Sequence, residues 1–121
     1  MYEKMTKENL SAKYSEDKNI TLHEFSVNET RFICTSQGLL FRQMKTGYWK
    51  EIKNTNNHAK GYNVILVNKK QYSRAKLILF AFNKINLDEK NKNIYHKNSN
   101  RLDCQLENLT LEVPDIYKPK N

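Results

Sequence analysis

Apolar residues gather in short clusters from residue 20 onward, and polar segments rich in turn-forming residues separate them. Clusters of this length, with β-branched and aromatic side chains, are typical of strands. We predict strands over residues 25–27, 31–35, 39–43, 48–52, 62–67 and 71–73. Turns at residues 36–38, 46–47 and 68–70 separate neighbouring strands, and the asparagine-rich segment 53–60 is predicted to be an exposed loop.

The spacing of apolar residues becomes helical after residue 75. Apolar positions between residues 77 and 82 form a wide face over about two turns, which predicts a helix. A second, short helix is predicted to open at Asp103 or Cys104 and to run through Leu109, with Asp103 as its N-cap.

The order of these elements predicts a single α+β domain that contains a small antiparallel β-sheet. We assign residues 20–113 to this domain, since a chain of 121 residues suits one domain. Residues 1–19 are polar with weak helical spacing, and we predict a flexible N-terminal arm there, either a frayed helix or a mobile segment. Residues 114–121 are predicted to form a loose tail.

The hydropathy pattern indicates a cytoplasmic protein without a membrane partner. No apolar run approaches the ~18 residues of a membrane span, and residues 1–10 lack the apolar region of a secretory signal. Cys34 and Cys104 are far apart and form no Cys-x-x-Cys pair, so we expect two reduced thiols rather than a zinc site or a disulfide framework.

Positive charge is concentrated in the second half of the chain. The net charge is +8, and residues 60–121 carry twelve Lys and Arg against six Asp and Glu. A basic surface favours polyanions and supports salt-sensitive binding of nucleic acid. The alternative is a generally basic protein from an AT-rich genome, which the seventeen Lys against four Arg also fit.

Residues 94–109 form the most informative part of the chain. They contain, in order, Ile94-Tyr95-His96, Asn98, Asn100, Leu102-Asp103 and Glu107-Asn108-Leu109. This series resembles the core of HNH nucleases of the homing-endonuclease and phage type. Upstream, residues 61–82 look like the strand, hairpin and helix that precede this core in the family, and residues 32–38 look like the hairpin of a small module often found before it. The resemblance covers about residues 30–112.

The resemblance implies that a ββα-metal core follows the small sheet, and that the chemistry is metal-dependent. In the family a divalent cation, usually magnesium, is held by an Asp and by the Asn that matches Asn108, and the His that matches His96 is the general base. Here the metal-binding Asp aligns with Tyr95, and the family's first His and following Arg align with Ala75 and Lys76. Because tyrosine is neutral near pH 7 and magnesium prefers carboxylate oxygens, the resemblance implies impaired or lost catalysis.

Polar residues around this core are candidates for contacts with nucleic acid. They are Lys69, Lys70, Lys76, Lys92, Lys97, Asn98, Asn100 and Arg101. Each has a simpler alternative: the basic residues as solvated charge and the asparagines as turn residues. His96 could equally hydrogen-bond a backbone group, and Tyr95 could pack in the core or stack on a base. Asp103 or Glu107 could replace the missing carboxylate, or act only as a helix cap and a surface residue.

Three functions follow from these observations. The first is a nucleic-acid-binding protein derived from an HNH nuclease, encoded by a phage or mobile element, with catalysis impaired or lost; DNA is favoured over RNA as its partner. The second is an active magnesium-dependent nicking or homing endonuclease, with Mg²⁺ as its cofactor. The third is a basic protein that inhibits or modifies a host nucleoprotein machine, with a host protein as partner.

Overall fold

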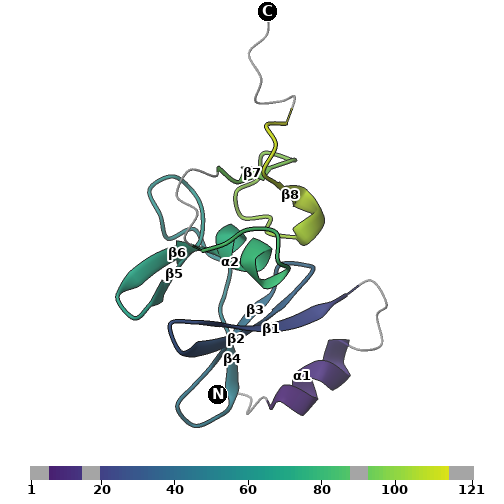
Figure 1. Ribbon diagram of the computed structural model, residues 1–121, viewed down its shortest axis with the longest axis vertical. Coiled ribbons are helices and arrows are strands. Elements are labelled where there is room, and N and C mark those ends of the chain that lie inside the picture. The colour runs from purple at the N-terminus through teal and green to yellow at the C-terminus, as the bar shows by residue number, and fades with distance from the viewer. Residues whose placement is uncertain (1–5, 15–19, 88–92, 115–121) are drawn as a thin grey trace, which may run out of the picture.

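The computed structural model describes residues 6–14, 20–87 and 93–114, and the fold is mixed α+β (Figure 1). The elements are α1 (Lys7–Tyr14), β1 (Leu22–Val27), β2 (Thr30–Thr35), β3 (Leu40–Gln43), β4 (Trp49–Glu51), β5 (Val64–Val67), β6 (Lys70–Ser73), α2 (Arg74–Ala81), β7 (Tyr95–His96), the 3-10 helix η1 (Leu106–Asn108) and β8 (Leu109–Thr110). The predicted α+β class is confirmed, and the six predicted strands correspond to β1 to β6.

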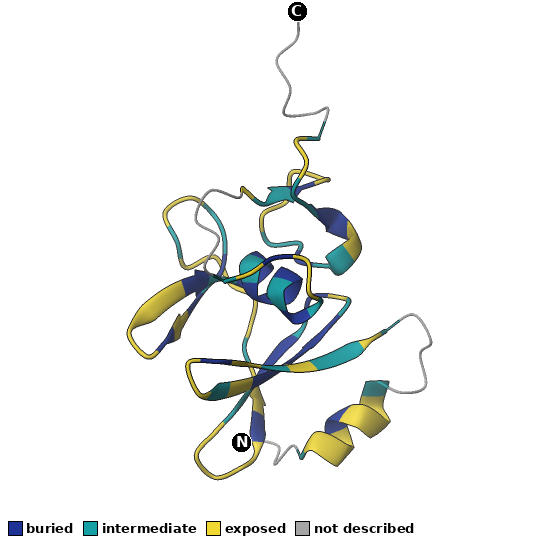
Figure 2. Ribbon diagram, in the orientation of Figure 1, coloured by how far each residue is buried: buried dark blue, intermediate teal, exposed yellow. Residues whose placement is uncertain are grey.

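Strands β1 to β4 form an antiparallel meander with the strand order β1-β2-β3-β4. Because side chains alternate along a strand, Phe32 and Cys34 of β2 enter the core cluster that contains α2, whereas Ile33 enters a second cluster on the other face. Buried residues are concentrated in α2 and in the strands beneath it (Figure 2). The sheet is therefore covered on both faces, by α2 on one and α1 on the other (Figure 1).

Helix α1 is anchored to the sheet through Leu10, which is 1% exposed and packs with Ile33, Phe41 and Trp49. In addition, Lys7 Nζ donates to Glu24 Oε2 at 2.6 Å. Part of the predicted N-terminal arm is thus packed on the sheet over Lys7–Tyr14. Residues 1–5 and 15–19 of that arm lie outside the described residues.

The hairpin β5–β6 leads directly into helix α2. Its turn is Asn68–Lys69, with φ of 47° and 69°, so Lys70, predicted as a turn residue, begins β6. The Ser73 hydroxyl caps α2 by accepting from the backbone N–H of Lys76 at 3.2 Å. The helix begins at Arg74, next to the start of the predicted helical pattern, and buries the predicted apolar face.

Arg74 is buried in the first turn of α2, and only 1% of its surface is exposed. Its Nε donates to the Gly38 carbonyl at 3.0 Å, and its Nη1 donates to the Ile52 carbonyl at 2.8 Å and to Asn63 Oδ1 at 3.3 Å. Burial lowers the pKa of the guanidinium from its usual value. One side chain therefore ties α2 to the meander, to the end of β4 and to the start of β5.

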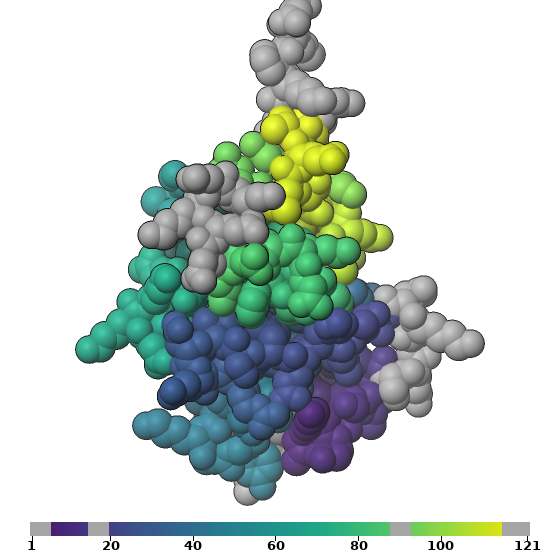
Figure 3. Space-filling view, viewed as in Figure 1, coloured from purple at the N-terminus to yellow at the C-terminus, as the bar shows by residue number. Residues whose placement is uncertain are grey.

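The turn after β2 holds the C-terminal part of the chain. Gly38 has a φ of 87°, and a Cβ on it would lie 2.7 Å from the carbonyl carbon of Cys104. Next to it, the Ser36 carbonyl accepts from Leu106 N–H at 2.8 Å. The C-terminal segment, drawn in yellow-green, accordingly lies against the α2 layer in the space-filling view (Figure 3).

Strands β7 and β8 form a short antiparallel pair, with Tyr95 opposite Thr110 and His96 opposite Leu109. The predicted helix from Asp103 or Cys104 is wrong in extent, because only Leu106–Asn108 is helical. Asp103 is not the N-cap either: Gln105 is, and Asp103 Oδ1 accepts from the Gln105 N–H at 3.3 Å within a turn.

No helix follows β8 in residues 111–114. The predicted tail lies outside the described residues from residue 115 onward. Within the described ranges, neither helix is long and apolar enough to cross a membrane.

Candidate functional site

A pocket of about 520 Å³ lies where the start of α2, strand β7 and the loop before β5 meet. Ala75, Tyr95 and His96 all line it, although they come from two segments of the chain. These are the positions where the resemblance places the family's first His, metal-binding Asp and general base. The structure thus brings the three aligned positions into one pocket.

His96 lies in β7 and is 8% exposed. Burial is the main cause of a lowered pKa for its imidazole; the positive charge of Arg101 lowers it further, while the Asp103 carboxylate acts in the opposite direction. A histidine with a lowered pKa is neutral near pH 7 and is able to accept a proton. A neutral imidazole is the form that a general base requires, and the role of His96 as a base stays a prediction.

The asparagines of the motif shape the loop between β7 and β8. Asn108 Oδ1 accepts from the Asn98 N–H at 3.0 Å, and Asn108 Nδ2 donates to Asn98 Oδ1 at 3.0 Å and to the Asp103 carbonyl at 2.9 Å. Asn98 Nδ2 donates to Asp103 Oδ2 at 2.7 Å. Asn100 Oδ1 accepts from the Leu102 N–H at 3.1 Å. The structure shows these side chains in the turn-forming role that was the simpler alternative; their contacts with nucleic acid stay predictions.

The donors around the pocket do not fit a magnesium ion. The lining residues of this described region include the cations Lys60, Lys76 and Arg101 and no carboxylate, and Asn108 is not among them. No group of three or more His, Cys, Asp or Glu side chains that could hold a metal occurs within the described ranges. Magnesium needs oxygen ligands with carboxylate help, so Asn108 as a metal ligand remains a prediction from the resemblance alone.

The predicted basic residues divide into two groups. Lys76 and Arg101 line the pocket, whereas Lys69, Lys70 and Lys97 are exposed outside it. Lys69 and Lys70 lie at the tip of the β5–β6 hairpin, and Lys97 begins the loop after β7. Residues 88–92, including Lys92, lie outside the described residues.

Among the lining residues that sequence reasoning did not assign to the site, Lys60 and Tyr62 matter most for the chemistry. They belong to the segment that was predicted only as an exposed loop and to the start of the following strand. The loop folds back because Asn57 pairs with the backbone of Val64, accepting from its N–H at 2.7 Å and donating to its carbonyl at 2.9 Å. Arg101 Nη1 then donates to the Lys60 carbonyl at 2.5 Å, which holds the loop beside the pocket. In the sequence these two residues are marked only by the local Lys-Gly-Tyr run, and that run alone does not indicate where they lie in the fold.

Comparisons with protein-family models, with curated proteins and with solved structures found no match. The HNH resemblance therefore stays a prediction.

Proposed function

We propose that this chain is a nucleic-acid-binding protein derived from an HNH nuclease, with catalysis impaired or lost. One observation carries the proposal: the pocket that unites Ala75, Tyr95 and His96 is lined by three cations instead of a metal-binding carboxylate. In this proposal β7, β8 and their loop are what remains of a ββα-metal core. Phosphate groups are the ligands that such a cationic pocket suits.

The charges next to the pocket favour a polyanion over a small neutral ligand. Lys60 and Arg101 are exposed, and the Lys76 side chain is half-buried beside them. Lys97 lies on the adjoining loop, and the second half of the chain carries most of the net positive charge. Cations placed this way contact phosphates independently of sequence and give binding that depends steeply on salt. We expect DNA to be the partner, and the phosphate contacts should contribute to the binding of any strand, whatever its sequence.

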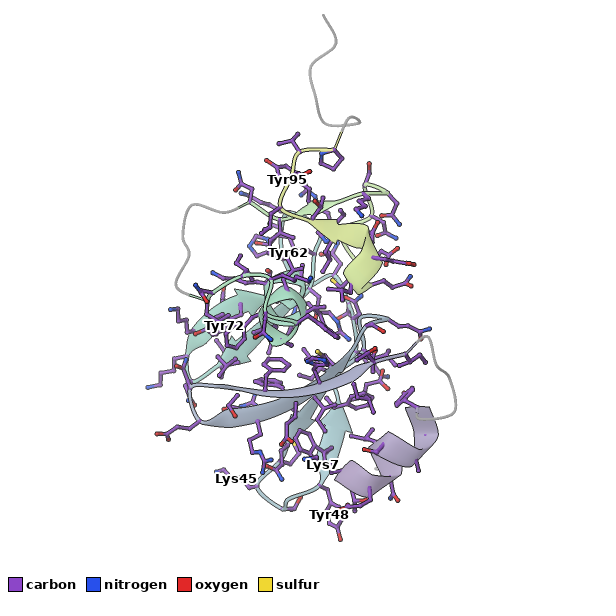
Figure 4. The ribbon with its side chains drawn as sticks, turned by 45° about the vertical axis from the view of Figure 1, so that its right-hand side comes forward. Lys7, Lys45, Tyr48, Tyr62, Tyr72 and Tyr95 are labelled. Atoms are coloured by element: carbon purple, nitrogen blue, oxygen red, sulfur yellow. The ribbon has the colours of Figure 1, made fainter. Side chains whose placement is uncertain are left out.

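The test is a titration of the full chain with a fluorescent DNA duplex at several salt concentrations. We expect the affinity to fall with salt, with a log–log slope of about −0.9 for each phosphate neutralised. Lys76→Gln should weaken binding to all sequences and reduce the magnitude of the slope by about one. Lys45→Gln is the matched control, since Lys45 lies in the turn at the opposite end of the molecule from Tyr95 (Figure 4). Absence of binding at low salt, or an unchanged slope in Lys76→Gln, would contradict the proposal.

An active endonuclease is the second candidate, and His96 is the observation that favours it. Its lowered pKa leaves the imidazole neutral in the pocket. Incubation of supercoiled plasmid with the wild-type chain and magnesium or manganese separates the two functions. We expect no efficient cleavage. Robust metal-dependent cleavage that is abolished by His96→Ala would establish the nuclease instead.

A further inference from the structure

Two tyrosines share the cationic pocket. Tyr62 and Tyr95 line it together with Lys60, Lys76 and Arg101. In the side-chain view both tyrosines lie in the upper part of the molecule, far from Tyr48 (Figure 4). Phosphate contacts alone need only the cations, so the aromatic rings call for a ligand that also has a flat, apolar surface.

The ring of Tyr62 is held in place from outside the pocket. The imidazole of His58 stacks on it with centroids 4.3 Å apart and an interplanar angle of 22°, and His58 Nε2 lies 3.3 Å from the Tyr62 hydroxyl oxygen. His58 Nδ1 in turn accepts from the Lys60 N–H at 3.1 Å. His58 is not among the pocket's lining residues, so it supports the phenol ring without filling the pocket. A ring that is already fixed loses little conformational entropy when a ligand stacks on it.

The same contacts set the cations beside this ring. His58 binds the backbone of Lys60, and Arg101 Nη1 donates to the carbonyl of Lys60 at 2.5 Å. The stacked tyrosine and two of the three cations are thus parts of one hydrogen-bonded unit. Lys76 completes the set from the first turn of α2, where the Ser73 cap holds its backbone.

The volume also points beyond a bare phosphate. About 520 Å³ lies within the range of pockets that hold small organic ligands, roughly 300–1,000 Å³. Asn63 and Ser73 also line the pocket, but Asn63 is buried and its amide is bonded to Arg74 and to the Thr55 carbonyl. The Ser73 hydroxyl, which accepts from the Lys76 N–H, still has its own proton to donate to a base edge. A base in a duplex presents neither of its faces, because both are stacked, whereas an unpaired base presents them.

We propose that this pocket takes one unpaired nucleotide of a single strand, with its base stacked on Tyr62 and its phosphate held by Lys60, Lys76 and Arg101. This inference rests on the proposed nucleic-acid binding and specifies its substrate: single-stranded or locally unpaired DNA rather than continuous duplex. Stacking of this kind tolerates any base, so the preference is for strand state and not for sequence.

The test compares four forms of the full chain: wild type, Tyr62→Phe, Tyr62→Leu and the control Tyr48→Leu. Tyr48 is 38% exposed and lies at the far end of the molecule, so it matches Tyr62 in chemistry without lining the pocket (Figure 4). Each form is titrated with a single-stranded oligonucleotide that contains the fluorescent base 2-aminopurine, and with the matching duplex. Circular dichroism verifies the fold of each variant.

We expect the wild type to bind the single strand more tightly than the duplex and to quench the 2-aminopurine. Tyr62→Phe should keep both properties, because the ring remains. Tyr62→Leu should lose the quenching and about fivefold or more of the single-strand affinity while leaving duplex affinity unchanged. Tyr48→Leu should behave as wild type.

The outcomes separate this inference from the function on which it rests. Equal binding of both substrates, or unchanged quenching in a folded Tyr62→Leu variant, overturns the unpaired-nucleotide site and leaves phosphate binding standing. Loss of all binding at low salt overturns both. A mononucleotide that competes as well as the oligonucleotide would show that the pocket serves a free nucleotide, and this too overturns the proposal for a strand.

Discussion

In the proposed function, the side chains of Ala75, Tyr95 and His96 determine what the pocket does to a phosphodiester. His96 is buried, and burial lowers its pKa, so its imidazole is neutral near pH 7. In the proposed function Tyr95 supplies a phenol in place of the family's metal-binding carboxylate, and Ala75 supplies no ligand at all. Because all three line the same pocket, we expect that substitution there supplies the family's metal-dependent chemistry.

We predict that the double variant Tyr95→Asp, Ala75→His gains detectable nicking of supercoiled plasmid with magnesium or manganese. The first substitution adds a carboxylate beside His96, and the second adds the family's other His in the same pocket. His96→Ala on this background should remove the activity. Asn108→Ala should also remove it, although it breaks the loop hydrogen bonds as well and is the less specific control. A folded, DNA-binding double variant that stays inactive would contradict the alignment of Tyr95 with the metal-binding Asp.

Arg74 is the largest fully buried side chain within the described residues. We predict that Arg74→Met lowers the free energy of unfolding by at least about 2 kcal/mol, because three buried acceptors lose their charged donor. Urea denaturation measures this. Arg42→Met is the control: Arg42 is partly exposed and its Nη1 makes one hydrogen bond, to the Leu66 carbonyl at 3.2 Å. If both substitutions lowered the free energy of unfolding by the same amount, the buried hydrogen bonds of Arg74 would contribute no more to stability than the exposed one of Arg42.

At the scale of elements, the turn after β2 connects the meander to the loop that carries the motif asparagines. We predict that Gly38→Ala destabilises the fold by more than Gly47→Ala. Both glycines have φ near 90°, so both substitutions incur backbone strain of about 1–3 kcal/mol. A Cβ at Gly38 would also lie 2.7 Å from the Cys104 backbone, whereas at Gly47 nothing lies within 4 Å. Thermal unfolding of the two variants measures the difference. Similar losses of stability in both would contradict the close approach of the Gly38 and Cys104 backbones.

Strands β1 to β6 could be predicted from the sequence because each is a local feature. A short apolar cluster bounded by turn residues fixes the type of the element and its limits to within a few residues, as in β2 and β3. The two-residue strands β7 and β8 were not predicted, since neither contains such a cluster. Helix α1 could be predicted only weakly, since Leu10 is its one buried residue and gives no periodicity. The segment after Asp103 was predicted as a longer helix because Asp103 is a plausible N-cap, whereas the Asp103 carbonyl accepts from the Asn108 side chain and only Leu106–Asn108 is helical.

The candidate site was predictable in part for the same reason. The resemblance aligned Ala75, Tyr95 and His96 with the residues of one site, and the three do line one pocket, but their roles in such a site stay predictions. Lys60 and Tyr62 could not be assigned, because their position depends on Asn57 folding the loop back and on Arg101 holding it. The burial of Arg74 was likewise unpredictable, as its three acceptors come from separate parts of the chain.

At the scale of the whole molecule, stability should depend on pH through His96. Because the folded protein lowers the pKa of this imidazole below its usual 6.5, the unfolded chain binds more protons in the interval between the two values. The free energy of unfolding is therefore largest above about pH 6.5 and falls as the pH drops through that interval. It levels off below the folded pKa. Glu24, whose pKa is lowered chiefly by its hydrogen bond with Lys7, adds a further loss only below its usual 4.5.

We predict that urea denaturation of the wild type between about pH 5 and 7.5 shows this fall, and that His96→Gln flattens it. Glutamine keeps a polar side chain at the buried position but does not titrate, so the comparison is of slopes rather than of absolute stability. A variant with the wild-type slope would show that other groups cause the dependence and that burial of His96 has little effect on its protonation.

The neutral imidazole also affects DNA binding, because an imidazole that stays neutral in the folded state down to lower pH adds no positive charge to the pocket. The salt dependence of DNA binding should then be the same at about pH 7.5 and just below pH 6.5, with Lys60, Lys76 and Arg101 supplying the charge in both cases.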